Sequence, residues 1–116
     1  MHTNSVLVTG ASGFVGRHVV PWLASRGWDV TAAGRSVTPA PSTSSRWRSR
    51  AAPDFSQPFD ATSLVRDRSG RPYHAIVHLA GLAHQPRGTG ADAFIRINVD
   101  ATTRLAAAAA EAGVEH

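Results

Sequence analysis

Near its start the chain reads Ser5-Val6-Leu7-Val8-Thr9-Gly10-Ala11-Ser12-Gly13-Phe14-Val15-Gly16, and this stretch decides the fold. The short Val-rich run Ser5–Thr9 is bounded by glycine, which predicts a strand buried on both faces. The segment Phe14–Arg26 carries apolar residues at helical spacing and is followed by Gly27, which predicts a helix. Strand, glycine-rich turn and helix start therefore follow one another directly.

This order of elements is one that receives a dinucleotide pyrophosphate, because backbone N–H groups and the helix N-terminus point at the phosphates. The three glycines serve different purposes. Gly10 permits the tight turn, Gly13 allows close approach of the main chain to the phosphates, and Gly16 allows the helix to pack on the sheet. The alternative is a tight strand–helix turn that binds nothing.

The rest of the chain alternates strands and helices, which predicts a parallel α/β layer with right-handed connections and strand order 3-2-1-4. Residues 36–58 are rich in Ser, Pro and Arg, so we expect a long irregular loop holding at most a poor third strand near Ala51–Phe55. Pro21 is expected to kink its helix or to cost it a hydrogen bond. The other expected strands and helices are Trp28–Ala33, Ala61–Asp67, Tyr73–Leu79 and Ala91–Ala112, with Val114-Glu115-His116 leading towards a fifth strand.

Composition limits the function. All twelve basic residues are Arg, and the formal charge is +4. These residues are scattered and aromatics are few, so nucleic-acid binding is disfavoured. No cysteine is present, no apolar run approaches the roughly 18 residues needed to span a bilayer, and no signal peptide is evident. The histidines lack ligand spacing, so no metal is expected. We expect a cytoplasmic protein that binds neither membrane nor nucleic acid.

Gly10-x-x-Gly13-x-x-Gly16 resembles the glycine turn of extended short-chain dehydrogenases/reductases. His78-Leu79-Ala80-Gly81 resembles the segment that ends their fourth strand, and Asn98-Val99-Asp100-Ala101-Thr102 resembles their Asn-Val-x-Gly-Thr box with Ala101 in place of glycine. The chain thus resembles the N-terminal portion of the NAD-dependent epimerase/dehydratase family, the relatives of UDP-glucose 4-epimerase. The resemblance implies a single domain over 1–116, an incomplete Rossmann-type sheet with helices on both faces that stops before its fifth strand.

The resemblance also implies a cofactor, NAD or NADP. Arg35 follows the second strand where NAD enzymes carry an acid, which favours the 2′-phosphate of NADP; the alternative is a side chain that stacks on adenine or is simply solvated. Asp60 resembles the carboxylate that accepts the adenine amine, and it fits a helix N-cap equally well. The residues implied to bind the cofactor are Gly10, Ser12, Gly13, Phe14, Val15, Gly16, Arg35, Asp60, Leu79, Ala80, Gly81 and Asn98.

No catalytic residue is expected in this chain. The superfamily places a Lys four residues after a catalytic Tyr, so that the cation favours the phenolate. Here the sole Tyr, Tyr73, is followed by Val77 and no Lys exists. We expect the cofactor-binding portion of a nucleotide-sugar epimerase, dehydratase or reductase for surface polysaccharides, inactive alone. It would bind a nucleotide sugar only with the missing half present and would self-associate through the exposed edge of Tyr73–Leu79. The alternative is a non-catalytic NAD(P)-binding regulator.

Overall fold

The computed structural model describes residues 4–34, 47–55, 57–80 and 96–116. Four parallel strands lie in the order β3-β2-β1-β4, as the sequence predicts. Their bounds are Ser5–Thr9 (β1), Asp29–Gly34 (β2), Trp47–Ala51 (β3) and Ala75–His78 (β4). The parallel sheet of a Rossmann-type fold is thereby confirmed.

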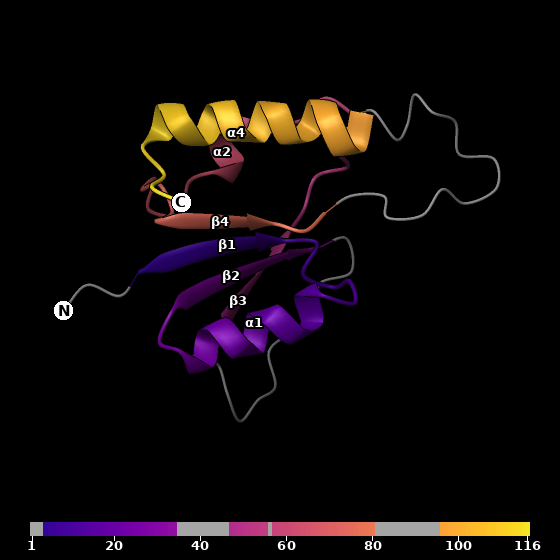
Figure 1. The fold of residues 1–116 in the computed structure, drawn as a ribbon. Coiled ribbons are helices and arrows are strands. Elements are labelled where there is room, and N and C mark those ends of the chain that lie inside the picture. The colour runs from indigo at the N-terminus through magenta and orange to yellow at the C-terminus, as the bar shows by residue number, and fades with distance from the viewer. Residues whose placement is uncertain (1–3, 35–46, 56, 81–95) are drawn as a thin grey trace.

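Helices cover both faces of this sheet (Figure 1). Helix α1, Gly16–Ser25, lies on one face, and α2, Ala61–Leu64, and α4, Ala101–Ala112, lie on the other. A π-helical turn, Arg96–Asp100 (η1), leads into α4. No helix among the described residues is both long and apolar enough to cross a membrane.

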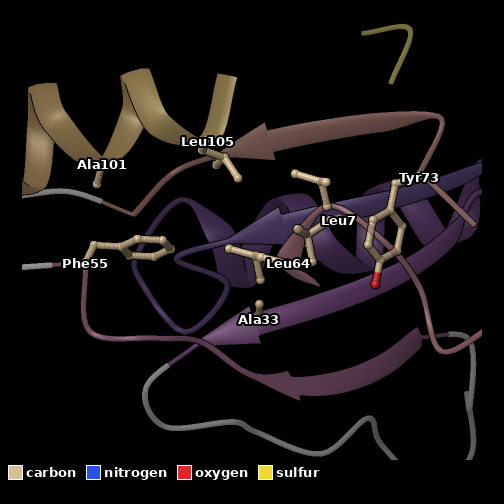
Figure 2. Packing of buried hydrophobic residues seen from close by; sticks show 8 residues of the cluster. Leu7, Ala33, Phe55, Leu64, Tyr73, Ala101 and Leu105 are labelled. Atoms are coloured by element: carbon tan, nitrogen blue, oxygen red, sulfur yellow. The ribbon is translucent and has the colours of Figure 1, made fainter. Parts of the chain in front are cut away.

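Strand β1 forms the centre of the core, because its side chains point alternately to the two faces. Val6 and Val8 pack with Val20 under α1, whereas Leu7 packs with Leu64 and Leu105 on the opposite side. Figure 2 shows this second cluster, with Phe55 and Tyr73 closing its two ends. All three apolar residues of β1 are essentially inaccessible, as expected for a strand buried on both faces.

The third strand corrects the sequence prediction. It occupies Trp47–Ala51 inside the segment expected to be irregular, and Phe55 is a core residue outside any strand. β3 pairs with β2 from Val30↔Trp47 to Gly34↔Ala51. It is an edge strand whose side chains are half-buried or exposed. Trp47 packs against the core and polar residues follow it, so no run of apolar residues marks the strand and its backbone pairing defines it.

β1 has the predicted bounds and β2 is shifted by one residue, whereas the helices and β4 are shorter than predicted. α1 begins at Gly16 and runs through Pro21. Proline has no N–H to donate to the helix, and because Pro21 is exposed, this backbone hydrogen bond is missing on the solvent-facing side of α1. The predicted helix Ala61–Asp67 is the single turn α2, and β4 lacks Tyr73, His74 and Leu79. In the described part of the predicted helix Ala91–Ala112, the α-helix begins only at Ala101, after the π-helical turn.

The free edge of β4 is partly covered, contrary to our expectation. The amides of Glu115 and His116 donate to the His74 carbonyl, and the Ile76 amide donates to the His116 carbonyl over 2.9 Å. This alternation is that of a parallel ladder with His116 opposite Ala75. The chain's last residues therefore bond to one position of the β4 edge without forming a strand of the four-stranded sheet, so this edge is only partly open.

Candidate functional site

The turn after β1 is built as the glycine spacing requires. Gly10 has φ +65°, and its carbonyl accepts the Gly13 amide over 3.0 Å. The Ala11 amide donates to the Ala33 carbonyl over 3.1 Å, which ties the turn to β2. A Cβ on Gly16 would lie 2.7 Å from the Cα of Ala11, so the absence of a side chain lets α1 start directly on the turn.

Three consecutive amides at the start of α1 are free to bind an anion. Within the described part of the chain, no carbonyl or side chain accepts a hydrogen bond from the amides of Phe14, Val15 or Gly16. The helix has no side-chain N-cap. Phe14 is 73% and Val15 53% exposed, so this end of the helix is open to solvent. Unpaired amides and the positive end of the helix dipole together suit a phosphate group.

The space over the turn is open where a pyrophosphate would lie. A Cβ on Gly13 would meet only the Gly10 carbonyl oxygen, at 3.2 Å, among the described residues. On the β2 side the Ser12 hydroxyl oxygen lies 2.9 Å from where a Cβ of Gly34 would stand. Little of the described chain therefore stands over Gly13, and the Ser12 hydroxyl lies close to the end of β2, an arrangement compatible with a dinucleotide.

The end of β4 lies directly against the turn. The backbone nitrogen of Ala80 would be 2.6 Å, and the carbonyl carbon of Leu79 2.7 Å, from a Cβ on Gly10. The Leu79 amide donates to the Thr9 carbonyl over 3.2 Å. The structure therefore brings Leu79 and Ala80 next to the glycine turn, as a shared cofactor site requires. That they bind the cofactor stays a prediction.

Asp60 is an N-cap. Its Oδ1 accepts the Ser63 amide over 3.1 Å, and the side chain is exposed. One oxygen and the remaining lone pairs are still available, so the cap does not exclude the predicted acceptance of an adenine amine. Asn98 lies in the π-helical turn before α4. Arg35 and Gly81 lie outside the described residues.

Sequence reasoning missed one polar pair beside this site. Thr9 Oγ1 lies 2.6 Å from His78 Nδ1, and the Ala80 amide donates to the same hydroxyl over 3.3 Å. The His78 ring stacks edge-on to Phe55, and its Nε2 is buried without a partner among the described residues. Burial lowers the pKa of His78 below its ordinary value, so the neutral ring is favoured. Thr9 and His78 are far apart in sequence, which explains why no local spacing reveals them.

Tyr73 is a core residue. It is 3% exposed, and its hydroxyl accepts a hydrogen bond from Arg50 over 3.3 Å. The same guanidinium donates to the carbonyls of Ser63, Leu64 and Arg66 at the end of α2. Both side chains therefore have structural partners. In the described ranges no three His, Asp or Glu side chains are grouped as metal ligands would be.

Comparisons with known proteins agree with this geometry. The model of the NAD dependent epimerase/dehydratase family matches residues 6–116. MoeE5 in complex with UDP-glucuronic acid and NAD is 35% identical, with a TM-score of 0.73 over 96% of this chain and 34% of its own. Uronate dehydrogenase from Agrobacterium tumefaciens is 25% identical, with a TM-score of 0.70 over 97% of this chain and 38% of its own. Divinyl chlorophyllide a 8-vinyl-reductase from Zea mays is 34% identical over 124 residues, 97% of this chain and 28% of the reductase. The chain thus spans well under half the length of each of these proteins.

Proposed function

Since the chain belongs to the NAD dependent epimerase/dehydratase family, we propose that its glycine turn binds the pyrophosphate of a nicotinamide dinucleotide. The observation that carries this proposal is the row of amides at Phe14, Val15 and Gly16, which have no acceptor among the described residues and lie next to the sparsely occupied space over Gly13. Such amides stabilise an anion without a charged side chain.

The neighbouring residues each have a role in this proposal. Ser12 offers its hydroxyl to a phosphate oxygen, Leu79 and Ala80 border the adenosine ribose, and Asp60 accepts the adenine amine. Asn98 completes the site from the π-helical turn before α4. When bound, the nicotinamide ring would supply a hydride acceptor or donor; this chain's own residues bind and orient the phosphates.

The preference for NADP rests on Arg35. It comes directly after β2, and no acidic residue stands at this position or beside it. Dinucleotide-binding folds of this kind recognise the adenosine ribose from the end of the second strand. A guanidinium there suits a 2′-phosphate.

We further propose that the substrate of the complete protein is a nucleotide sugar. MoeE5, with UDP-glucuronic acid and NAD bound, supports this class. Hydride transfer at a sugar carbon in surface-polysaccharide synthesis is the role we infer. The chain holds no Lys, so a Tyr-x-x-x-Lys pair must come from elsewhere and these residues alone are proposed to be inactive. The second candidate is a non-catalytic NAD(P)-binding regulator, in which the Tyr-x-x-x-Lys pair is missing altogether.

The test is an equilibrium titration of the purified chain with NAD, NADP and ADP by calorimetry. We expect binding at up to millimolar concentration, with NADP tighter than NAD. Gly13→Val should abolish binding while the chain still folds, because the Gly10 carbonyl oxygen, 3.2 Å from the Cβ position, is the one described atom that must shift to admit the side chain. Gly70→Ala is the control, since it lies outside the site and no described atom is near its Cβ position; its φ of +84° costs about 1 kcal/mol of stability and should leave binding unchanged. Absence of NAD, NADP and ADP binding at millimolar concentration would refute the proposal.

The DNA downstream of this sequence distinguishes the two candidate functions. A reading frame that continues into a Ser and a Tyr-x-x-x-Lys motif supports the enzyme. A stop codon with no such motif supports the regulator.

A further inference from the structure

Two hydroxyl–imidazole pairs join β1 to β4, one at each end of the strands. At the amino ends the Ser5 amide donates to His74 Nδ1 over 3.0 Å, and the Ser5 hydroxyl lies 3.2 Å from the same nitrogen. At the carboxyl ends Thr9 and His78 form the shorter contact of 2.6 Å. Only the second pair lies beside the glycine turn.

Thr9 holds the backbone that follows β4 with two groups. Its carbonyl accepts the Leu79 amide over 3.2 Å, and its hydroxyl accepts the Ala80 amide over 3.3 Å. The Thr9 side chain is completely buried. Because Thr9 directly precedes Gly10, these bonds also hold the Leu79 and Ala80 backbone against Gly10, so close that a Cβ on Gly10 would overlap it.

The His78 ring in turn holds the Thr9 hydroxyl. A hydroxyl has one proton and two lone pairs, so Thr9 Oγ1 accepts the Ala80 amide and still either donates to or accepts from Nδ1. Phe55 packs edge-on against the ring at 5.4 Å between centroids, which limits its rotation. The ring's other nitrogen has no acceptor among the described residues, so Nδ1 is the ring's polar anchor there.

We propose that Thr9 and His78 are positioning residues for the dinucleotide: the pair sets where the Leu79–Ala80 backbone lies relative to Gly10, and thereby the width of the site. This inference rests on the proposed function of the glycine turn. Neither side chain needs to touch the cofactor. The Ser5–His74 pair joins the same two strands at the far end and has no such role.

The first experiment measures dinucleotide affinity in matched variants. Thr9→Val keeps the shape of the side chain and removes the hydroxyl, and we expect NAD or NADP to bind about 3- to 10-fold more weakly, the effect of one or two hydrogen bonds. Thr9→Ser should restore affinity to within about 2-fold because it returns the hydroxyl. His78→Asn keeps a polar atom near the position of the histidine Nδ1, so this variant should bind NAD or NADP more tightly than His78→Leu does. His74→Leu is the control and should leave affinity unchanged.

The second experiment needs no ligand. Amide hydrogen exchange by NMR should show loss of protection at Ala80 in Thr9→Val and His78→Leu, and not in His74→Leu. If the wild-type chain binds no dinucleotide, the proposed function fails. The Ala80 exchange rate still decides whether the Thr9–His78 pair holds the Leu79–Ala80 backbone. Unchanged Ala80 protection in Thr9→Val would overturn the inference, as would equal loss of affinity in His74→Leu and His78→Leu.

Discussion

Replacing Gly10 by Ala tests the glycine turn most directly, because two separate costs meet at this residue. Its φ of +65° is unfavourable for any residue with a Cβ, which costs about 1–2 kcal/mol. The new methyl group would also lie 2.6 Å from the Ala80 nitrogen and 2.7 Å from the Leu79 carbonyl carbon. Relieving that overlap displaces backbone, at about 1–3 kcal/mol. We expect Gly10→Ala to lower the free energy of unfolding by about 2–5 kcal/mol.

Two other glycines separate these costs. Gly113 has φ +89° and nothing near its Cβ position, so Gly113→Ala carries the conformational cost alone, about 1 kcal/mol. Gly16 has no positive φ, yet its Cβ would lie 2.7 Å from the Ala11 Cα, so Gly16→Ala carries the steric cost alone. The loss of unfolding free energy in Gly10→Ala should therefore be larger than that in Gly113→Ala. The difference between the two should be comparable to the loss measured in Gly16→Ala.

Urea unfolding followed by circular dichroism gives the measurement. The slope of unfolding free energy against urea should stay unchanged if the native state remains compact. A Gly10→Ala variant that loses no more stability than Gly113→Ala would refute the steric argument and the close approach of β4 to the turn.

Three further outcomes are expected. Arg50→Leu should lower the free energy of unfolding by about 1–3 kcal/mol, because the carbonyls of Ser63, Leu64 and Arg66 lose their donor, whereas the exposed Arg48→Leu should stay within about 0.5 kcal/mol in the same denaturation assay. Burial lowers the pKa of His78 from its ordinary value of 6.5, so between the lowered value and pH 6.5 the unfolded chain binds more protons than the folded chain. The free energy of unfolding, measured against pH, should therefore fall as the pH drops through 6.5. His78→Leu should flatten this part of the curve. Sedimentation velocity should show reversible self-association through the rest of the β4 edge, and a concentration-independent monomer would contradict it.

The centre of the fold is predictable from sequence because its signals are local. β1 is a continuous apolar run, α1 follows a helical period, and the glycines sit at the turn between them. Gly113 ends α4 in the left-handed conformation expected of a helix C-cap. These features need no knowledge of distant residues.

The features that sequence reasoning missed depend on partners far along the chain. β3 is recognisable only by its pairing with β2, since its side chains are polar or half-exposed. His78 and Thr9 are 69 positions apart, and Arg50 reaches carbonyls 13–16 positions away. The folded chain creates these contacts, across the sheet for β3 and for the Thr9–His78 pair and between β3 and α2 for Arg50, and nothing in the neighbouring residues predicts them.

Strand β3 is attached to the protein differently from its neighbours. None of its residues belongs to the fully buried core, and its anchors are the ladder to β2, the half-buried Trp47 packed against the core under α1, and the Arg50 guanidinium that reaches the end of α2. Its detachment therefore exposes less apolar surface than the loss of β1 or β2, whose residues fill the core. We expect β3 to unfold locally, as a small cooperative unit, at a lower free energy than the rest of the sheet. β1, β2 and β4 should stay folded until the whole chain unfolds.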